Sequence, residues 1–171
     1  MTMADNIVVM SNGQVEQFGP PQDIYHKPVN AFVADFIGRA NFFEGTMQGG
    51  KITVGNLSLD AGSKRFIDGS PVVVAIRPEK ISLDADMPQA NRAQGEVVFV
   101  RDVGATRDIH LNTPLGPMIV EYAIGEGARR FTVGEKTDGA GVIDYLTEKT
   151  DVQLPESALY VYPAEQKQKS A

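Results

Sequence analysis

The stretch PVVVAIRPEK at residues 71–80 decides most of what can be expected of this 171-residue chain. Its apolar run, Val72 to Ile76, lacks the alternation of a half-solvated strand, so we expect it to be buried on both faces. Pro78 has no backbone N–H and ends the hydrogen-bonded ladder. We interpret Arg77, Pro78 and Glu79 as a structural corner at the end of a barrel. A bidentate ion pair between Arg77 and a carboxylate is the alternative.

Short predicted strands surround this run and fall into two groups. The first group comprises residues 42–47, 51–54, 57–59, 71–77 and 80–83, and the second comprises residues 95–101, 108–112, 118–122, 142–146 and 158–162. Residues 84–92 are a polar connection between the groups, and residues 134–141 are predicted to be a loop. Seventeen glycines and ten prolines, most of them after residue 44, supply the turns. This pattern predicts a mainly β chain with tandem five-stranded barrels of the OB kind.

A β-hairpin is predicted before the barrels, with strands at residues 7–10 and 15–18 joined by Ser11-Asn12-Gly13. Asn-Gly readily adopts the two positive φ angles of a type I′ turn. A lone hairpin is marginally stable in water, so its apolar face needs a cover. We expect residues 2–19 to bury against a second copy of the chain, with folding back onto a barrel or disorder as the alternatives.

Two short helices are predicted after the hairpin. Residues 21–26 form the first, because Pro21 suits the first position of a helix. Residues 31–37 form the second, which Asn30 can cap and Gly38 can end. We expect one apolar face of the second helix to pack on a core. That face consists of four residues, Phe32, Val33, Phe36 and Ile37.

Composition excludes several classes of function. The chain has no cysteine, which removes disulfides, zinc–cysteine sites, iron–sulfur clusters and thiol catalysis. Its two histidines, His26 and His110, are too few for a multi-histidine metal site. The net charge of −6 disfavours nucleic acid as the main partner, because that affinity comes largely from neutralising phosphates. No apolar stretch approaches the roughly 20 residues that span a bilayer, and no signal peptide is visible.

No set of residues forms a recognisable catalytic or cofactor site. Residues 134–137, GEKT, lack the second glycine and the following helix of a phosphate-binding loop. Four arginines lie among acidic residues and are interpreted as a solvated face or as members of ion pairs: Arg101, Arg107, Arg129 and Arg130. We therefore predict no catalytic, cofactor-binding or metal-binding residue in this chain. The structural or interface candidates are Arg77, Pro78, Glu79, Phe32 and Phe36.

Several stretches resemble one family, the ATP-binding subunits of ABC importers. Residues 2–28 resemble the end of the ATPase domain, and residues 32–42 resemble the link into its C-terminal regulatory region. Residues 75–81 resemble the Arg-Pro-Glu motif of the TOBE domain, a transport-associated OB fold. The matches at residues 100–106 and 159–163 are looser. Pro20 stands where the family usually has threonine, which removes one helix cap.

The resemblance implies a domain plan and no enzyme activity. Residues 1–40 would be a remnant of the ATPase domain, 41–86 a first OB-like part, 87–165 a second OB-like or TOBE part, and 166–171 a disordered tail. The Walker A, signature, Walker B and switch-histidine motifs of the family do not occur in the sequence. We therefore expect no cofactor in this chain, with ATP and Mg²⁺ bound only by the remaining part of a parent subunit. Met1 would then be a start within a longer family sequence.

The implied function is a regulatory and dimerisation module of an importer ATP-binding subunit, of the polyamine, ferric iron or sugar type. The expected partners are a second copy of the chain, the ATPase core, the membrane permease subunits and a possible small-molecule ligand. The expected location is cytoplasmic, peripheral to the inner membrane within the transporter complex. The alternative is a free-standing TOBE-type protein that binds an oxyanion, such as molybdate, or another small solute. A third class, an oligonucleotide-binding OB protein, is disfavoured by the acidic charge.

Overall fold

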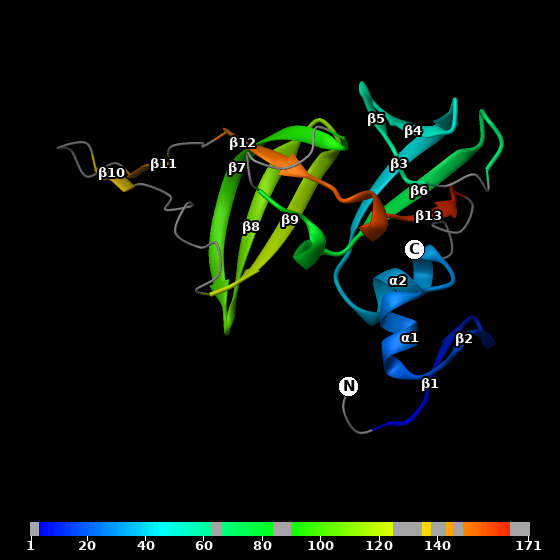
Figure 1. Ribbon diagram of the computed structural model, residues 1–171. Helices are drawn as coiled ribbons and strands as arrows, with labels where there is room; N and C mark the ends of the chain where they lie inside the picture. The colour runs from blue at the N-terminus through cyan, green and yellow to red at the C-terminus, as the bar shows by residue number, and fades with distance from the viewer. Residues whose placement is uncertain are drawn as a thin grey trace.

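The computed structural model describes residues 4–62, 66–83, 90–124 and 149–164, together with the backbone of residues 135–137 and 143–145 (Figure 1). Two antiparallel sheets form the main body, and an N-terminal hairpin with two short helices lies beside the first of them. The fold class predicted from the sequence, mainly β and OB-like after a hairpin and two helices, is confirmed. Of the two five-stranded units predicted, the first sheet has five strands and the second has four among the described residues.

The first sheet has five strands in the order β13-β6-β3-β4-β5. Their bounds are β3 (Asn41–Gln48), β4 (Lys51–Val54), β5 (Leu57–Leu59), β6 (Pro71–Ile76) and β13 (Tyr160–Pro163). On β6, Val72, Val74 and Ile76 face the main core, whereas Ala75 packs on the other side of the sheet against the second helix. The prediction that this run is buried on both faces is confirmed.

The second sheet has four strands among the described residues, in the order β12-β7-β8-β9. Their bounds are β7 (Arg92–Val103), β8 (Thr106–Thr113), β9 (Gly116–Ala123) and β12 (Lys149–Gln153). Phe43 and Met47 of the first sheet share one apolar core with Ile109 and Val120 of the second. We call the two sheets with this common core the two-sheet body. Burial of a single continuous apolar core favours the two sheets folding as a unit.

The predicted strand at residues 80–83 is wrong. Pro78–Lys80 forms a 3₁₀ turn, η1, because Pro78 occupies its first position and the Lys80 N–H donates to the Arg77 carbonyl at 3.0 Å. Ser82 then makes only an isolated bridge with Gln153. The corner therefore turns the chain out of the first sheet instead of adding a strand to it.

The second group of strands also differs from the prediction. β13, expected in the second group, pairs with β6 in the first sheet, so the two sheets do not divide at one point of the chain. The strand β12 was not predicted. The strand predicted at residues 142–146 is present as β11 (Ile143–Tyr145). It pairs with β10 (Glu135–Thr137), which lies where a loop was predicted at residues 134–141. The domain boundaries stay a prediction, and the expected tail at residues 166–171 lies outside the described residues.

The N-terminal elements agree with the prediction in type and position. β1 (Ile7–Ser11) and β2 (Gln14–Gly19) form the hairpin, and Asn12 and Gly13 have φ of 49° and 77°. The helices are α1 (Pro21–His26) and α2 (Ala31–Ile37). The Asn30 side chain caps α2 by accepting a hydrogen bond from the Val33 N–H at 2.9 Å. We call residues 7–37 the hairpin–helix module.

Three of the four residues predicted on the buried face of α2 pack on a core, because Phe32 and Ile37 are partly buried against the buried Val33. Val33 is buried with Val9 and Ile24, but the Phe36 side chain is 64% exposed. Ala31 and Ala34 form a second buried face, which turns toward Ala75 of β6. Alanine carries only a methyl group, so this face lets the helix approach the sheet closely, while the Phe36 ring is left on the outside.

Candidate functional site

Arg77 lies where β6 ends and the chain turns toward the second sheet. The residue is 2% exposed, and its Nη1 donates to the carbonyls of Ala34, Gly38 and Arg39 at 2.8, 2.7 and 3.1 Å. These carbonyls end α2 or follow it, and the last carbonyls of a helix have no partner within the helix. A cation at this place also complements the helix dipole. Arg77 thus caps α2 from the sheet and contacts carbonyls rather than a carboxylate.

Tyr25 and Glu79 complete the surroundings of this guanidinium. The Arg77 Cζ lies 4.5 Å from the centre of the Tyr25 ring, a cation–π arrangement. The Tyr25 hydroxyl donates to Glu79 Oε1 at 2.8 Å. Burial, and then the hydrogen bond to Glu79, raise the pKa of Tyr25 to about 12, so the hydroxyl stays a donor at physiological pH. The corner Arg77-Pro78-Glu79 therefore holds both helices.

Arg39 lies between α2 and β3 and connects this part of the chain to the second sheet. Its guanidinium donates to both carboxylate oxygens of Asp108, at 2.6 and 3.0 Å, and also to Glu121. Asp108 has a fully buried side chain, and Arg101 of β7 donates to it at 3.1 Å. The hydrogen bonds from Arg39 lower the pKa of Asp108 against the opposing effect of burial, and those from Arg101 lower it further. The carboxylate is held ionised by two arginines.

Two asparagine side chains act as substitutes for strand backbone. The Asn41 amide donates to the Ile119 carbonyl at 2.8 Å and accepts from the Ile119 N–H at 2.7 Å, at the edge strand β9. The Asn91 amide makes the same pair of bonds with the Asp60 backbone, each at 2.6 Å. Asn91 has a φ of 54°, a conformation that asparagine tolerates better than most residues. Both amides satisfy backbone groups where one sheet meets the other.

One face of the hairpin is open. Val9 is buried against α1 and α2, whereas four side chains on the opposite face are about half exposed or more. We call these the outer stripe: Val8, Met10, Val15 and Phe18. The register pairs Val8 with Phe18 and Met10 with Val15, so the four lie side by side across the two strands. The hairpin therefore packs on its own helices rather than on a barrel, and dimerisation stays a prediction.

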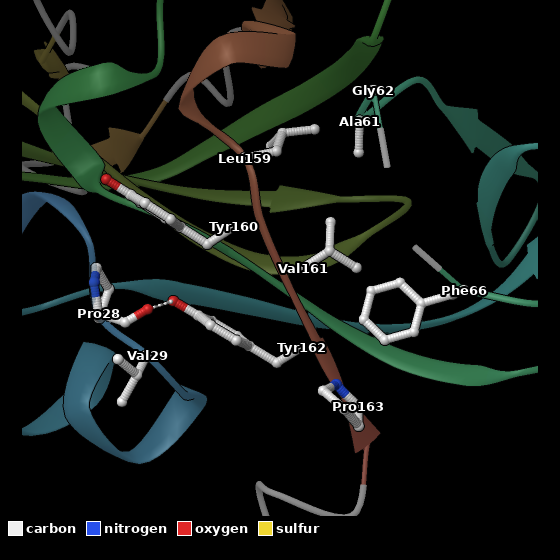
Figure 2. Close-up of a pocket in the computed structure, with 10 residues that line it drawn as sticks. All are labelled: Pro28, Val29, Ala61, Gly62, Phe66, Leu159, Tyr160, Val161, Tyr162 and Pro163. Carbon is white, nitrogen blue, oxygen red and sulfur yellow. Dashed lines mark hydrogen bonds between the residues drawn. The ribbon is translucent and has the colours of Figure 1, made fainter. Parts of the chain in front are cut away.

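A groove runs along β13, the edge strand of the first sheet (Figure 2). It has a volume of about 590 Å³, and ten residues line it, none of which has a charged side chain: Pro28, Val29, Ala61, Gly62, Phe66, Leu159, Tyr160, Val161, Tyr162 and Pro163. The Tyr160 and Tyr162 hydroxyls donate to the carbonyls of His26 and Pro28 at 2.9 and 3.1 Å. These tyrosines hold the α1–α2 connection against the sheet.

A second cavity, of about 810 Å³, lies where β12 meets η2 (Glu156–Ala158), and Glu156 is its one charged lining residue. Gln153 borders it and is 6% exposed, with its Nε2 donating to the Ala90 carbonyl at 2.6 Å. Among the described residues, no group of acidic or histidine side chains could hold a metal ion. Within the same ranges, no helix is long and apolar enough to cross a membrane.

The structure brings three of the five sequence candidates together and separates the others. Arg77, Pro78 and Glu79 form the corner that holds the helices, while the rings of Phe32 and Phe36 on α2 stack on each other with their centres 5.8 Å apart. The expected ion pairs exist for Arg101 with Asp108 and for Arg107 with Asp102, whereas Arg129 and Arg130 lie outside the described residues.

Sequence reasoning missed Arg39, Asn41 and Asp108. Arg39 and Asp108 are 69 residues apart in the chain, and no local pattern links them. The local pattern also misleads for Asp108. It lies directly before the core-facing Ile109, so the alternation of the strand predicts a solvated side chain, whereas the structure buries it.

The two-sheet body matches two known domain families. The CysA C-terminal regulatory domain matches residues 41–83, and the TOBE domain matches residues 74–138. The chain therefore belongs to the regulatory and TOBE domain families that ABC importer ATP-binding subunits carry. The resemblance inferred from the sequence is confirmed.

Curated relatives make the assignment more specific. The spermidine/putrescine import ATP-binding protein PotA of Acetivibrio thermocellus is 40% identical over 136 residues, which cover 79% of this chain and 37% of the relative. The putrescine transport ATP-binding protein PotG of Escherichia coli is 37% identical, over 70% of this chain and 34% of the relative. The sulfate/thiosulfate import ATP-binding protein CysA of Bacillus cereus is 34% identical, over 61% and 29%. The chain spans about a third of the length of these relatives.

A solved structure of similar fold is the molybdate-binding protein ModG, with a TM-score of 0.50 and 14% sequence identity. The match covers 71% of this chain and 94% of ModG. At this identity the likeness extends to the fold alone.

Proposed function

We propose that this chain is the regulatory and assembly module of an ABC importer ATP-binding subunit, and that it works by packing its outer stripe against a nucleotide-binding core. The outer stripe is the observation that carries the proposal, because its four apolar side chains are exposed on an ordered hairpin whose other face is already buried. Contiguous exposed apolar surface marks interaction sites. We further propose that the chain alone hydrolyses no ATP and that it acts in the cytoplasm, beside the permease subunits.

A binding experiment tests this function. The full chain would be mixed with the separately expressed N-terminal part of the Acetivibrio thermocellus relative, truncated before its matched region. We expect a complex in sedimentation velocity and a changed rate of ATP hydrolysis, while the chain alone shows none. Phe18→Ser should abolish the complex because it places a hydroxyl in the contact. Ile67→Ser is the matched control, since Ile67 is 82% exposed away from the stripe. Absence of a complex with the unmodified chain contradicts the proposal.

We propose self-association as a second function of the outer stripe, because an uncovered apolar hairpin can also pair with the hairpin of a second copy of the chain. Light scattering on the chain with and without residues 1–19 measures it. A dimer that becomes a monomer on truncation supports a homodimer through the hairpin. A monomer in both cases contradicts it.

Polyamines are the solute class that we propose for the parent importer. Five relatives named for spermidine or putrescine are 37–44% identical to this chain over the matched residues, against 32–34% for three relatives named for sulfate and thiosulfate. Uptake of labelled putrescine and labelled sulfate, in cells with and without the gene, separates the two classes. Loss of sulfate uptake alone would contradict the proposal.

Oxyanion capture, the alternative drawn from the sequence, gains no support from the two cavities described above. The groove along β13 has no charged side chain, and the cavity at η2 has only the acidic Glu156. An oxyanion prefers arginine, lysine or several converging N–H groups. Calorimetry against molybdate measures this directly, and we expect no heat of binding.

A further inference from the structure

The hairpin–helix module and the two-sheet body have separate apolar cores. The module buries Val9, Ile24 and Val33 among themselves, apart from the main core of the sheets. Between the two lies a small cluster of buried residues: Ala31, Ala34, Ala75 and Tyr162. Apolar contact is non-directional, and alanine methyl groups offer little shape to resist sliding. Beside the Tyr162 ring, directional polar contacts therefore set the orientation of the module, and they include the bonds of the Tyr160 and Tyr162 hydroxyls to the α1–α2 connection.

Arg77 supplies the most buried of these polar contacts. A single nitrogen, Nη1, reaches three carbonyls that belong to α2 or follow it, while the ring of Tyr25 covers the guanidinium. A Cβ on Gly38 would lie 3.4 Å from Arg77 Nη1 and 3.4 Å from the Tyr25 ring, an ordinary contact distance, so a side chain with atoms beyond Cβ would crowd the guanidinium. Arg77 thus touches both helices of the module from the end of β6.

Arg39 provides the attachment to the other sheet. Its carbonyl accepts from Arg77 of the first sheet, while its side chain binds Asp108 and Glu121 of the second. One residue of the connecting segment is therefore held by both sheets. Asn41, two residues further on, is bonded to Ile119 of β9, so the chain is fixed again as β3 begins.

We propose that Arg77, assisted by Arg39, is a positioning residue that locks the hairpin–helix module onto the two-sheet body, so that both move as one rigid unit. A lysine at position 77 cannot replace it, since an ammonium is a compact, strongly hydrated charge without the planar guanidinium that stacks on Tyr25. If a partner displaces the outer stripe, both sheets would then move together with the module, because the connecting segment does not bend. That consequence rests on the proposed function, whereas the lock itself is a property of this chain and is tested on it alone.

Distance measurement by pulsed electron resonance tests the lock. The chain has no cysteine, so labels can be placed by Gln14→Cys on the hairpin, Lys51→Cys on the first sheet and Asn112→Cys on the second, all exposed positions. In the otherwise unchanged chain, we expect one narrow distance distribution for each pair of labels. With Arg77→Lys, both pairs that include position 14 should gain a broad second population. The pair 51–112 should stay narrow, because the common core holds those two sheets together.

The controls decide between a local lock and a general loss of structure. Arg107→Lys is the matched control, because Arg107 pairs with Asp102 at the surface and does not touch the module. It should leave all three distributions narrow. If Arg77→Lys also broadens the distance distribution between positions 51 and 112, the measurement is repeated with Gly38→Val. This variant crowds the guanidinium without removing it. Narrow distributions for position 14 in a folded Arg77→Lys or Gly38→Val chain, or broad ones in the unchanged chain, overturn the proposal.

Discussion

The two-sheet body and the hairpin–helix module are stabilised by different kinds of interaction. The body buries branched and aromatic side chains of both sheets in one core. The module buries only Val9, Ile24 and Val33 in its own, and leaves the outer stripe exposed. It is attached through arginine and tyrosine donors to backbone carbonyls. Folding stability should therefore reside in the body, while the place of the module depends on a few directional bonds.

The same substitution in the two regions should have very different effects. Phe43 is 2% exposed in the body and Phe36 is 64% exposed on the module. Phe43→Ala should lower the free energy of unfolding by about 3–5 kcal/mol, through lost burial and the cavity left behind. Phe36→Ala should lower it by only about 1 kcal/mol, chiefly through loss of the stacking on Phe32. Urea unfolding followed by circular dichroism measures both. Similar losses would mean that α2 packs against surface not seen in this structure.

The Asp108 carboxylate, which binds both Arg39 and Arg101, lies where the hairpin–helix module meets the second sheet. Arg39 and Arg101 are each about half exposed, so Arg39→Gln or Arg101→Gln alone should cost about 1 kcal/mol or less, because the other arginine still neutralises Asp108. The double variant leaves a buried carboxylate without a cation and should cost about 3 kcal/mol or more.

Chemical unfolding of the four chains of this cycle gives the coupling between the two arginines. The control is Arg39→Gln combined with Arg92→Gln, which should be additive because Arg92 pairs with Asp151 elsewhere. Additive losses for Arg39 and Arg101 would show that each arginine holds Asp108 independently.

The pH dependence of stability should also reveal this carboxylate. The folded pKa of Asp108 is lowered, so its stabilisation is present above the unfolded value, about 3.9, and disappears as the pH falls through the folded value. The gap in unfolding free energy between the unchanged chain and Asp108→Asn should therefore be largest near pH 7 and shrink below about pH 4. Urea titrations at pH 7, 4 and 3 measure it. A gap independent of pH would mean that the cost of Asp108→Asn is steric.

Local patterns predicted the elements of both regions, but not how they meet. The Asn-Gly turn, the Asn30 cap and the apolar run of β6 each depend on neighbours in the chain, and all three are present in the structure. The predicted face of α2 packs on a core except at Phe36, but its second buried face was missed because hydrophobic periodicity favours large side chains. That second face uses Ala31 and Ala34 for close approach to the sheet.

The candidate site was predicted only in part, for a related reason. Arg77-Pro78-Glu79 stands out as a corner because proline changes the local backbone. What Arg77 binds, and that Arg39 binds Asp108, depends on which strands the fold brings together, and no short-range spacing encodes those pairs. The return of β13 to the first sheet was missed for the same reason.

Removing the Asn30 cap of α2 should have only a small effect on stability, and it tests whether the module opens independently of the two-sheet body. Asn30→Ala removes the bond to the Val33 N–H and the bond to Glu16, and should cost about 1 kcal/mol. If the module opens independently of the body, amide hydrogen exchange should accelerate about fivefold across α2 while the amides of β6 keep their rates. Asn30→Ser keeps a capping oxygen and should restore most of the protection. Equal acceleration in α2 and β6 would show instead that module and body unfold in one step, and that the bonds from Arg77 join them in stability as well as in position.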